Sequence, residues 1–156
     1  VWNTAVGTLP GAMPVLIGWC GLGGDLADWR AWAIAGLVVL WQFPHFMSIA
    51  WLYRHEYAGA GYQMWTTKDT SGMVAGIHAS LGAAALIALT IATMLPASGW
   101  QWGLVALAVL VGGQQLVAAI RFHRRRDDGT ARKLLRSSLI VLPLILLCVV
   151  LQSVLA

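Results

Sequence analysis

Five residues between positions 42 and 56 combine polar side chains with helical spacing in an otherwise apolar stretch. At about 100° per residue, one face of a helix would carry Gln42, His45, Ile49, Tyr53 and Glu56. A continuous helix would place His45 about 16 Å from Glu56 along its axis. Polar groups are costly inside a bilayer and often mark a functional site there. The spacing therefore predicts a polar stripe that leads from a surface carboxylate into a membrane.

The charged residues around this stripe are suited to an anionic headgroup. Arg54, Glu56 and Lys68 flank the sequence YAGAGYQM, whose glycines permit close approach of the backbone to a ligand. A carboxylate can hold Mg²⁺, which often bridges to substrate phosphates, while Arg and Lys neutralise the remaining phosphate charge. We therefore predict a site for an amphiphile with an anionic head, and the spacing alone leaves the amphiphile unidentified.

Each of these residues also has an ordinary interpretation. An intramembrane Gln or His can simply hydrogen-bond to a neighbouring helix, with a gain of about 1 kcal/mol. Arg54, Glu56 and Tyr57 are equally compatible with a polar flank at the membrane interface. Asn3 is compatible with a helix cap. Pro44 falls on a different face, where we expect it to kink the helix or release a backbone carbonyl.

The composition is that of a membrane protein. Of the 156 residues, 59% are hydrophobic and 10% are charged, whereas about 25% are charged in a typical soluble domain. Crossing a hydrocarbon core of ~30 Å takes roughly 20 helical residues. We expect an all-α polytopic transmembrane helical bundle and a single integral membrane domain over 1–156. Its five spans are expected at about 3–24, 32–53, 74–95, 101–120 and 137–156.

The cations follow membrane topology and do not form a nucleic-acid-binding face. If the spans alternate, segments 54–73 and 121–136 share one side of the membrane and carry every Lys and Arg except Arg30. Cytoplasmic segments are enriched in these residues, so we expect 54–73 and 121–136 to be cytoplasmic loops, or matrix-side loops in a mitochondrion. The basic cluster in 121–136 is expected to anchor the chain and attract anionic lipid headgroups. We expect no nucleic-acid partner.

The cysteines and the start of the chain add two expectations. Cys20 and Cys148 lie in separate predicted spans without a disulfide or metal-binding pattern, so we interpret both as small apolar helix residues. The chain begins with Val1 and enters an apolar run at once, without the charged region and cleavage site of a signal peptide. We therefore expect a fragment of a longer protein.

Three motifs in order carry a family resemblance. They are N-T-x-x-G from residue 3, W-Q-x-P-H-F from residue 41 and Y-x-x-A-G-x-x-M from residue 57. This pattern resembles the second half of the heme O synthases, the protoheme IX farnesyltransferases among the UbiA-type intramembrane prenyltransferases. The resemblance covers at least residues 3–64, and the three later spans agree with it in number and placement. It implies that the five spans are the last five of a nine-helix fold.

The resemblance implies an activity and its cofactors. Family members transfer the farnesyl group of farnesyl diphosphate to a vinyl group of heme b, with addition of water, giving heme O for terminal oxidase biogenesis. Mg²⁺, held between two acidic motifs in cytoplasmic loops, helps the diphosphate leave. The first motif, N-D-x-x-D, has no match in this chain. The resemblance therefore implies that the chain is inactive by itself.

The second acidic motif corresponds to RHEY at 54–57, where Glu56 stands in place of the usual Asp. Glu remains a competent oxygen ligand, although its extra methylene moves the carboxylate. The resemblance thus implies Arg54, Glu56 and Tyr57 as catalytic residues, with Glu56 also holding the metal. The residues expected to contact the substrates are Asn3, Gln42, His45, Tyr53 and Lys68.

Two other interpretations remain open. One is a UbiA-type prenyltransferase for a quinone or chlorophyll precursor, against which W-Q-x-P-H-F argues. The other is a non-catalytic membrane subunit or haem-binding assembly protein, whose charged loop serves only as an anchor. The partners implied are farnesyl diphosphate, heme b and the lipid bilayer, with heme A synthase or oxidase assembly factors as further candidates. We expect a bacterial plasma membrane over a mitochondrial inner membrane, because no presequence-like stretch is visible.

Overall fold

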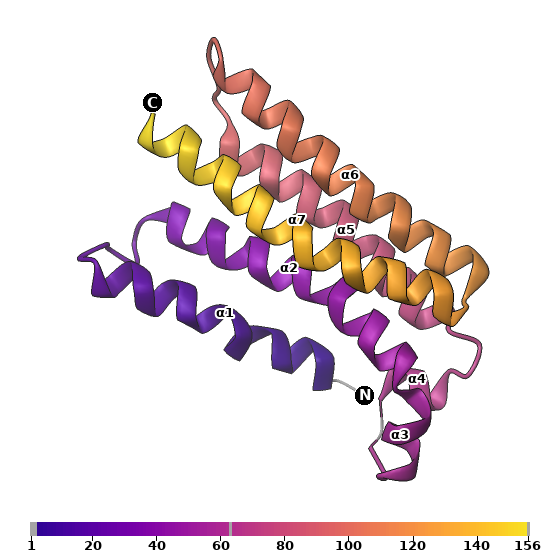
Figure 1. Ribbon diagram of the computed structural model, residues 1–156. Helices are drawn as coiled ribbons and strands as arrows, with labels where there is room; N and C mark the ends of the chain where they lie inside the picture. The colour runs from indigo at the N-terminus through magenta and orange to yellow at the C-terminus, as the bar shows by residue number, and fades with distance from the viewer. Residues whose placement is uncertain (1–2, 63, 156) are drawn as a thin grey trace.

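The computed structural model describes residues 3–62 and 64–155, and its regular elements are all helices (Figure 1). This confirms the predicted all-α class. The helices are α1 (Asn3–Gly21), α2 (Trp29–Leu52), α3 (Arg54–Gly59), α4 (Trp65–Lys68), α5 (Met73–Met94), α6 (Gln101–Arg125) and α7 (Asp128–Val154).

Four long helices form the bundle. In sequence they pack α2 on α5, α5 on α6 and α6 on α7, and α7 closes the bundle against α2. In the described part of the chain these same four helices are long and apolar enough to cross a membrane. The protein is therefore an integral membrane protein. The first predicted span corresponds to α1, which packs along α2 at the side of the bundle (Figure 1) and is not one of the four.

Pro44 lies inside α2 and does not end it. A proline in a helix crowds the carbonyl of the residue four positions earlier, which here is Leu40. Gly82 of α5 packs against this region, because an added Cβ would lie 2.6 Å from Phe43 Cβ, 3.1 Å from Pro44 Cδ and 3.2 Å from Leu40 O. The missing side chain at Gly82 therefore lets α5 approach the proline-containing part of α2.

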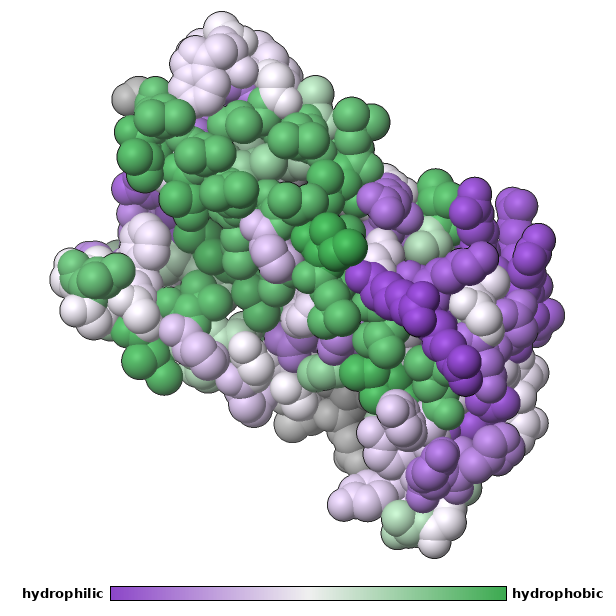
Figure 2. Space-filling model, in the orientation of Figure 1, coloured by the Kyte–Doolittle hydropathy of each residue, from purple (hydrophilic) through white to green (hydrophobic). Residues whose placement is uncertain are grey.

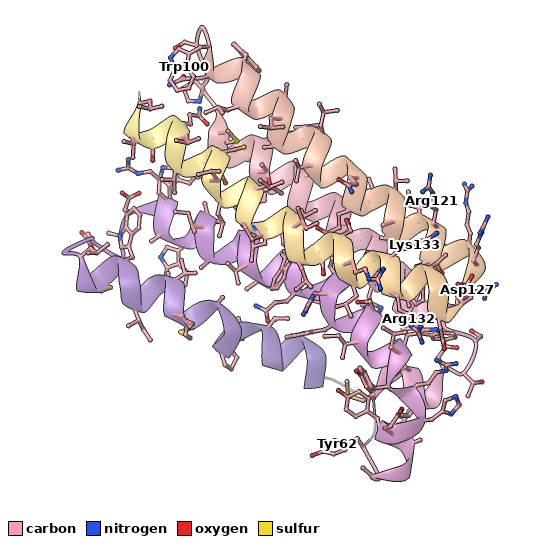
Figure 3. The ribbon with its side chains drawn as sticks, viewed as in Figure 1. Tyr62, Trp100, Arg121, Asp127, Arg132 and Lys133 are labelled. Carbon is pink, nitrogen blue, oxygen red and sulfur yellow. The ribbon has the colours of Figure 1, made fainter. Side chains whose placement is uncertain are left out.

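The charged segments gather at one end of the bundle. Figure 2 shows hydrophilic surface concentrated there and a broad hydrophobic surface over the middle of the visible face. In Figure 3, Arg121, Asp127, Arg132 and Lys133 lie at this end, whereas Trp100 lies at the opposite end. Arg54 of segment 54–73 pairs with Asp128 of segment 121–136, so the two segments meet at this end of the molecule.

The segment 121–136, which we expected to be a loop, is almost entirely helical. α6 continues to Arg125 and α7 begins at Asp128, so residues 126 and 127 alone connect them. Arg126 adopts a left-handed conformation with φ of 51°. The Asp127 carboxylate caps α7 by accepting a hydrogen bond from the Thr130 amide at 2.7 Å, and this bond lowers the pKa of Asp127. Because the turn is closed by these caps, both helices extend beyond their apolar spans and carry the cations on helical turns.

Candidate functional site

The predicted polar stripe is interrupted at Tyr53. α2 ends at Leu52 and α3 begins at Arg54, and Tyr53 between them has φ of −105° and ψ of 22°. The expectation of one continuous helix from Gln42 to Glu56 is therefore wrong, and the axial separation calculated from it does not apply. The Tyr53 amide still donates to Ile49 O at 3.0 Å. The interruption is consequently a local bend, which redirects the chain at the charged end of the bundle.

Gln42 faces α1. Its side chain is buried, and its Nε2 donates to the Thr8 carbonyl at 3.2 Å. A Cβ on Gly11 would lie 2.6 Å from Gln42 Oε1, whereas a Cβ on Gly7 would meet nothing within 4 Å. Gln42 thus has a helix-packing contact with Gly11. Asn3 is the first described residue of α1, and its side chain lies outside the described part.

His45 faces α7. Its Nδ1 lies 2.8 Å from Ser138 Oγ, and its ring stacks on Trp41 with the centroids 4.7 Å apart. Trp41 in turn donates from Nε1 to the Ser138 carbonyl at 2.6 Å. Two side chains of the W-Q-x-P-H-F motif are therefore fixed by one residue of α7. Gln42 and His45 contact different helices, so they do not line one wall as the stripe suggested.

Arg54 joins the end of α2 to α7. Its Nη1 donates to the Trp51 carbonyl at 2.7 Å and to Asp128 Oδ1 at 3.0 Å, and the guanidinium carbon lies 4.3 Å from the Trp51 ring centroid. The Trp51 indole donates to the same Asp128 oxygen at 3.0 Å. Asp128 was not predicted. An acid in the first turn of a helix is an ordinary dipole-stabilising residue, and no sequence signal links it to Arg54.

The remaining predicted site residues lie nearer the surface. Glu56 and Lys68 are exposed, and Tyr53 is 53% exposed. In the described part of the chain, no hydrogen bond or ion pair engages the Glu56 carboxylate. Tyr57 is half-buried and packs edge-on against Tyr62, with the ring centroids 6.1 Å apart. These residues share one end of the bundle, although the structure brings only Arg54 into an ion pair.

A cavity of about 320 Å³ opens beside Arg54. Thr66 closes part of its wall by donating from Oγ1 to the Ala50 carbonyl at 2.9 Å, so the segment after α3 folds back onto α2. The guanidinium is a suitable donor to phosphate oxygens, whereas the hydroxyls of Thr66 and Thr67 already donate to the backbone carbonyls of Ala50 and Met64. The sequence did not single out the threonines. The lining residues are Trp51, Arg54, His55, Ala58, Thr66, Thr67 and Thr70.

Asp69 fixes the connection between this cavity and α5. Its carboxylate accepts hydrogen bonds from the Ser71 hydroxyl, the Ser71 amide and the Val74 amide. These bonds, the Ser71 hydroxyl first, lower the pKa of Asp69. Asp69 is thus engaged by its own segment. Across residues 3–62 and 64–155, no three His, Cys, Asp or Glu side chains are grouped as a metal site.

The comparisons with known proteins define the class. The sequence pattern of the UbiA prenyltransferase family matches residues 1–150. This chain therefore belongs to the UbiA prenyltransferase family.

Individual relatives point to one branch of that family. The chain is 41% identical to the protoheme IX farnesyltransferase of Rhodopirellula baltica, over 97% of this chain and 55% of the relative. It is 36% identical to that of Salinibacter ruber, over 91% of this chain and 50% of the relative. A mitochondrial protoheme IX farnesyltransferase of Neurospora crassa is 35% identical over 97% of this chain and 32% of its own length. The chain thus spans about half the length of the bacterial relatives, and no solved structure matches it.

Proposed function

We propose that this chain is part of a heme O synthase. The observation that carries the proposal is its 41% identity, over 97% of the chain, to a protein named protoheme IX farnesyltransferase. In the proposed reaction the C1–O bond of farnesyl diphosphate breaks and diphosphate leaves with the electron pair. A vinyl carbon of heme b forms the new bond to C1. Water adds to the resulting cation and loses a proton, giving the hydroxyethylfarnesyl group of heme O.

The charged end is proposed to bind the diphosphate. Arg54 and Lys68 would neutralise its charge, and Tyr57 would donate a hydrogen bond. The exposed carboxylate of Glu56 fits one position of a Mg²⁺ site, because Mg²⁺ is commonly held by one or two carboxylates together with substrate phosphates. When bound, the ion supplies charge stabilisation to the leaving diphosphate. Diphosphate oxygens, water and other residues of the complete protein would supply the remaining oxygen ligands.

The membrane-depth residues are proposed to hold the organic parts of the substrates. Trp41 and His45 form a stacked aromatic pair that Ser138 of α7 fixes, and this pair is proposed to lie against the planar porphyrin. Tyr53 lies at the bend between the two regions and would line the path of the farnesyl chain. Gln42 and Asn3, on the α1 side, would border the same space.

The site of action and the partners are proposals of the same kind. We propose the bacterial plasma membrane as the location, although named relatives include both bacterial and mitochondrial proteins. Heme A synthase or oxidase assembly factors would receive the product. The view of the chain as the C-terminal half of a nine-helix enzyme, inactive alone, also stays a prediction.

The test is an assay of the complete protein that contains this segment. The purified protein would be incubated in detergent with heme b, farnesyl diphosphate and Mg²⁺, and the porphyrins separated by chromatography and identified by mass. We expect heme O, and release of one diphosphate for each farnesyl group transferred. Prenylation of 4-hydroxybenzoate or a chlorophyllide without prenylation of heme would instead support a different UbiA-type activity. Failure to prenylate any of these acceptors would favour a non-catalytic role.

A further inference from the structure

A chain of short hydrogen bonds holds His45. Its Nδ1 lies 2.8 Å from Ser138 Oγ, and the Ser138 hydroxyl lies 2.6 Å from the carbonyl of Leu135, to which it donates. The indole of Trp41, which stacks on the imidazole, is tied to the Ser138 carbonyl. The orientation of the imidazole is therefore set from two sides by one serine of α7.

The number of protons available in this chain of hydrogen bonds assigns the tautomer of His45. A hydroxyl has one hydrogen to donate, and a carbonyl oxygen can only accept. The Ser138 hydroxyl donates its hydrogen to Leu135 O. It can then form a hydrogen bond with His45 only as an acceptor, which requires that Nδ1 carries a proton and donates it. A neutral imidazole protonated at Nδ1 has its lone pair at Nε2. Ser138 thus favours a His45 whose free lone pair points away from α7.

Nε2 is open to a ligand. Across the described residues it has no hydrogen-bond partner, and it is not one of their buried side-chain atoms that lack a partner. The side chain of His45 is half-buried, so the nitrogen lies at the edge of the helix packing. A neutral imidazole nitrogen oriented by a hydrogen bond on its other nitrogen is the arrangement common to metal-binding histidines.

We propose that His45 Nε2 binds the iron of the porphyrin substrate as an axial ligand, with Ser138 as its positioning residue. The inference rests on the proposed function, because the porphyrin enters through the similarity to protoheme IX farnesyltransferases. Imidazole is a frequent axial ligand of haem iron. Stacking on Trp41 restricts rotation of the imidazole and would hold the porphyrin at a fixed height on the side of His45 that faces away from α7. Iron coordination would thereby position the vinyl group for transfer.

The test compares two porphyrins that differ only in the metal. The complete protein would be titrated in detergent with heme b and with metal-free protoporphyrin IX, and binding followed by absorbance and fluorescence. We expect His45→Ala to weaken heme b binding by about 100-fold or more, at or above the upper end of the roughly 10- to 100-fold loss seen when the hydrogen-bond partner of a metal ligand is removed. Protoporphyrin IX binding should change less than about 2-fold. Added imidazole should restore the Soret spectrum of the variant.

Neighbouring serines provide the matched control. Ser138 holds His45, whereas the buried hydroxyl of Ser137 has no partner among the described residues. We expect Ser138→Ala to weaken heme b binding by about 10-fold and to alter the Soret band, and Ser137→Ala to change neither. Replacing serine by alanine is a small change in a helix. The comparison of Ser138→Ala with Ser137→Ala therefore still tests the proposal if His45→Ala fails to fold.

The outcomes separate this inference from the proposed function. Equal weakening of heme b and protoporphyrin IX by His45→Ala would overturn iron coordination and leave only ring packing. Unchanged binding of both would also overturn it. A His45-dependent Soret band in a protein that makes no heme O would support iron coordination while overturning the proposed reaction.

Discussion

The membrane-depth region around His45 and the charged end around Glu56 differ in how completely this chain satisfies their polar groups. At membrane depth, His45 and Trp41 are both hydrogen-bonded to Ser138. At the charged end, Arg54 is paired with Asp128, but the Glu56 carboxylate has no partner within the described part of the chain. The charged end thus presents an unpaired carboxylate, whereas at membrane depth the contact of Nδ1 with Ser138 orients the open Nε2 of His45.

The contrast has a physical cause. An unpaired polar group costs several kcal/mol in hydrocarbon, so pairing within the bundle is favoured at membrane depth, as it is for His45 and Trp41 with Ser138. Gln42 Oε1 and Ser137 Oγ, in contrast, have no partner among the described residues. At the interface, water satisfies a carboxylate at little cost. An unpaired charged group is therefore less costly at the charged end than at membrane depth. This difference agrees with the proposed assignment of the diphosphate to the charged end and of the porphyrin to the membrane-depth residues.

The largest expected effect is on Glu56 in the complete protein. Glu56→Gln keeps the size of the side chain and removes its charge, so we expect the rate of farnesyl transfer to fall about 100-fold or more. Glu56→Asp, which restores the acid usual at this position in the resembling family, should retain much of the activity. The measurement is heme O formed per minute from heme b and farnesyl diphosphate with Mg²⁺. If Glu56→Gln formed heme O at the wild-type rate, the Glu56 carboxylate would not belong to the site, and the contrast between the two regions would not hold.

The packing of α5 on α2 can be tested by a substitution at Gly82. Gly82→Ala would place Cβ 2.6 Å from Phe43 Cβ, and overpacking of this kind costs about 1 to 3 kcal/mol. Gly103→Ala on α6 is the matched control, because its Cβ would meet nothing within 4 Å. Thermal unfolding in detergent should show a lower midpoint for Gly82→Ala and an unchanged or higher one for Gly103→Ala. Equal midpoints would mean that α5 does not rest closely on α2.

A smaller effect is expected from the ion pair at the charged end. Asp128→Asn removes the charge facing Arg54 and keeps an oxygen that accepts from Trp51. With 48% of the Asp128 side chain and 23% of the Arg54 side chain exposed, solvent screening limits the loss to about 1 kcal/mol or less. The comparison is with Asp28→Asn, which breaks the pair with Arg30 at the opposite end. A loss of unfolding free energy well above this range would place Arg54 among the packed structural residues.

The smallest effect is a pH dependence at Asp69. Hydrogen bonds from Ser71 and Val74 lower its pKa, so its contribution to stability is present above the ordinary Asp pKa of 3.8 and is lost as the pH falls through the lowered value. The difference in thermal midpoint between wild type and Asp69→Asn should therefore be present at neutral pH and disappear in acid below that range. A difference that grows on acidification would contradict this assignment.

The local sequence predicted which segments form long helices better than it predicted the residues at which the helices begin and end. The long apolar runs became α2, α5, α6 and α7, because helical hydrogen bonding must be satisfied within each segment in a membrane. The bend at Tyr53 was missed, since helical spacing continues through it and the stabilising contact between Arg54 and the Trp51 carbonyl is a matter of side-chain conformation. The turn at 126–127 is not marked by hydropathy, because the apolar spans end well before the helices that contain them.

The sequence by itself determined the membrane class, the helices, the shared end of the charged segments and the motifs that mark a UbiA prenyltransferase. These depend on composition and on spacing along one helix. Only the tertiary structure decided that His45 meets Ser138 and that Arg54 meets Asp128, across 93 and 74 residues of chain. The reason is geometric: a shift of one residue rotates a helix face by about 100°, so which side chains meet depends on how the helices pack.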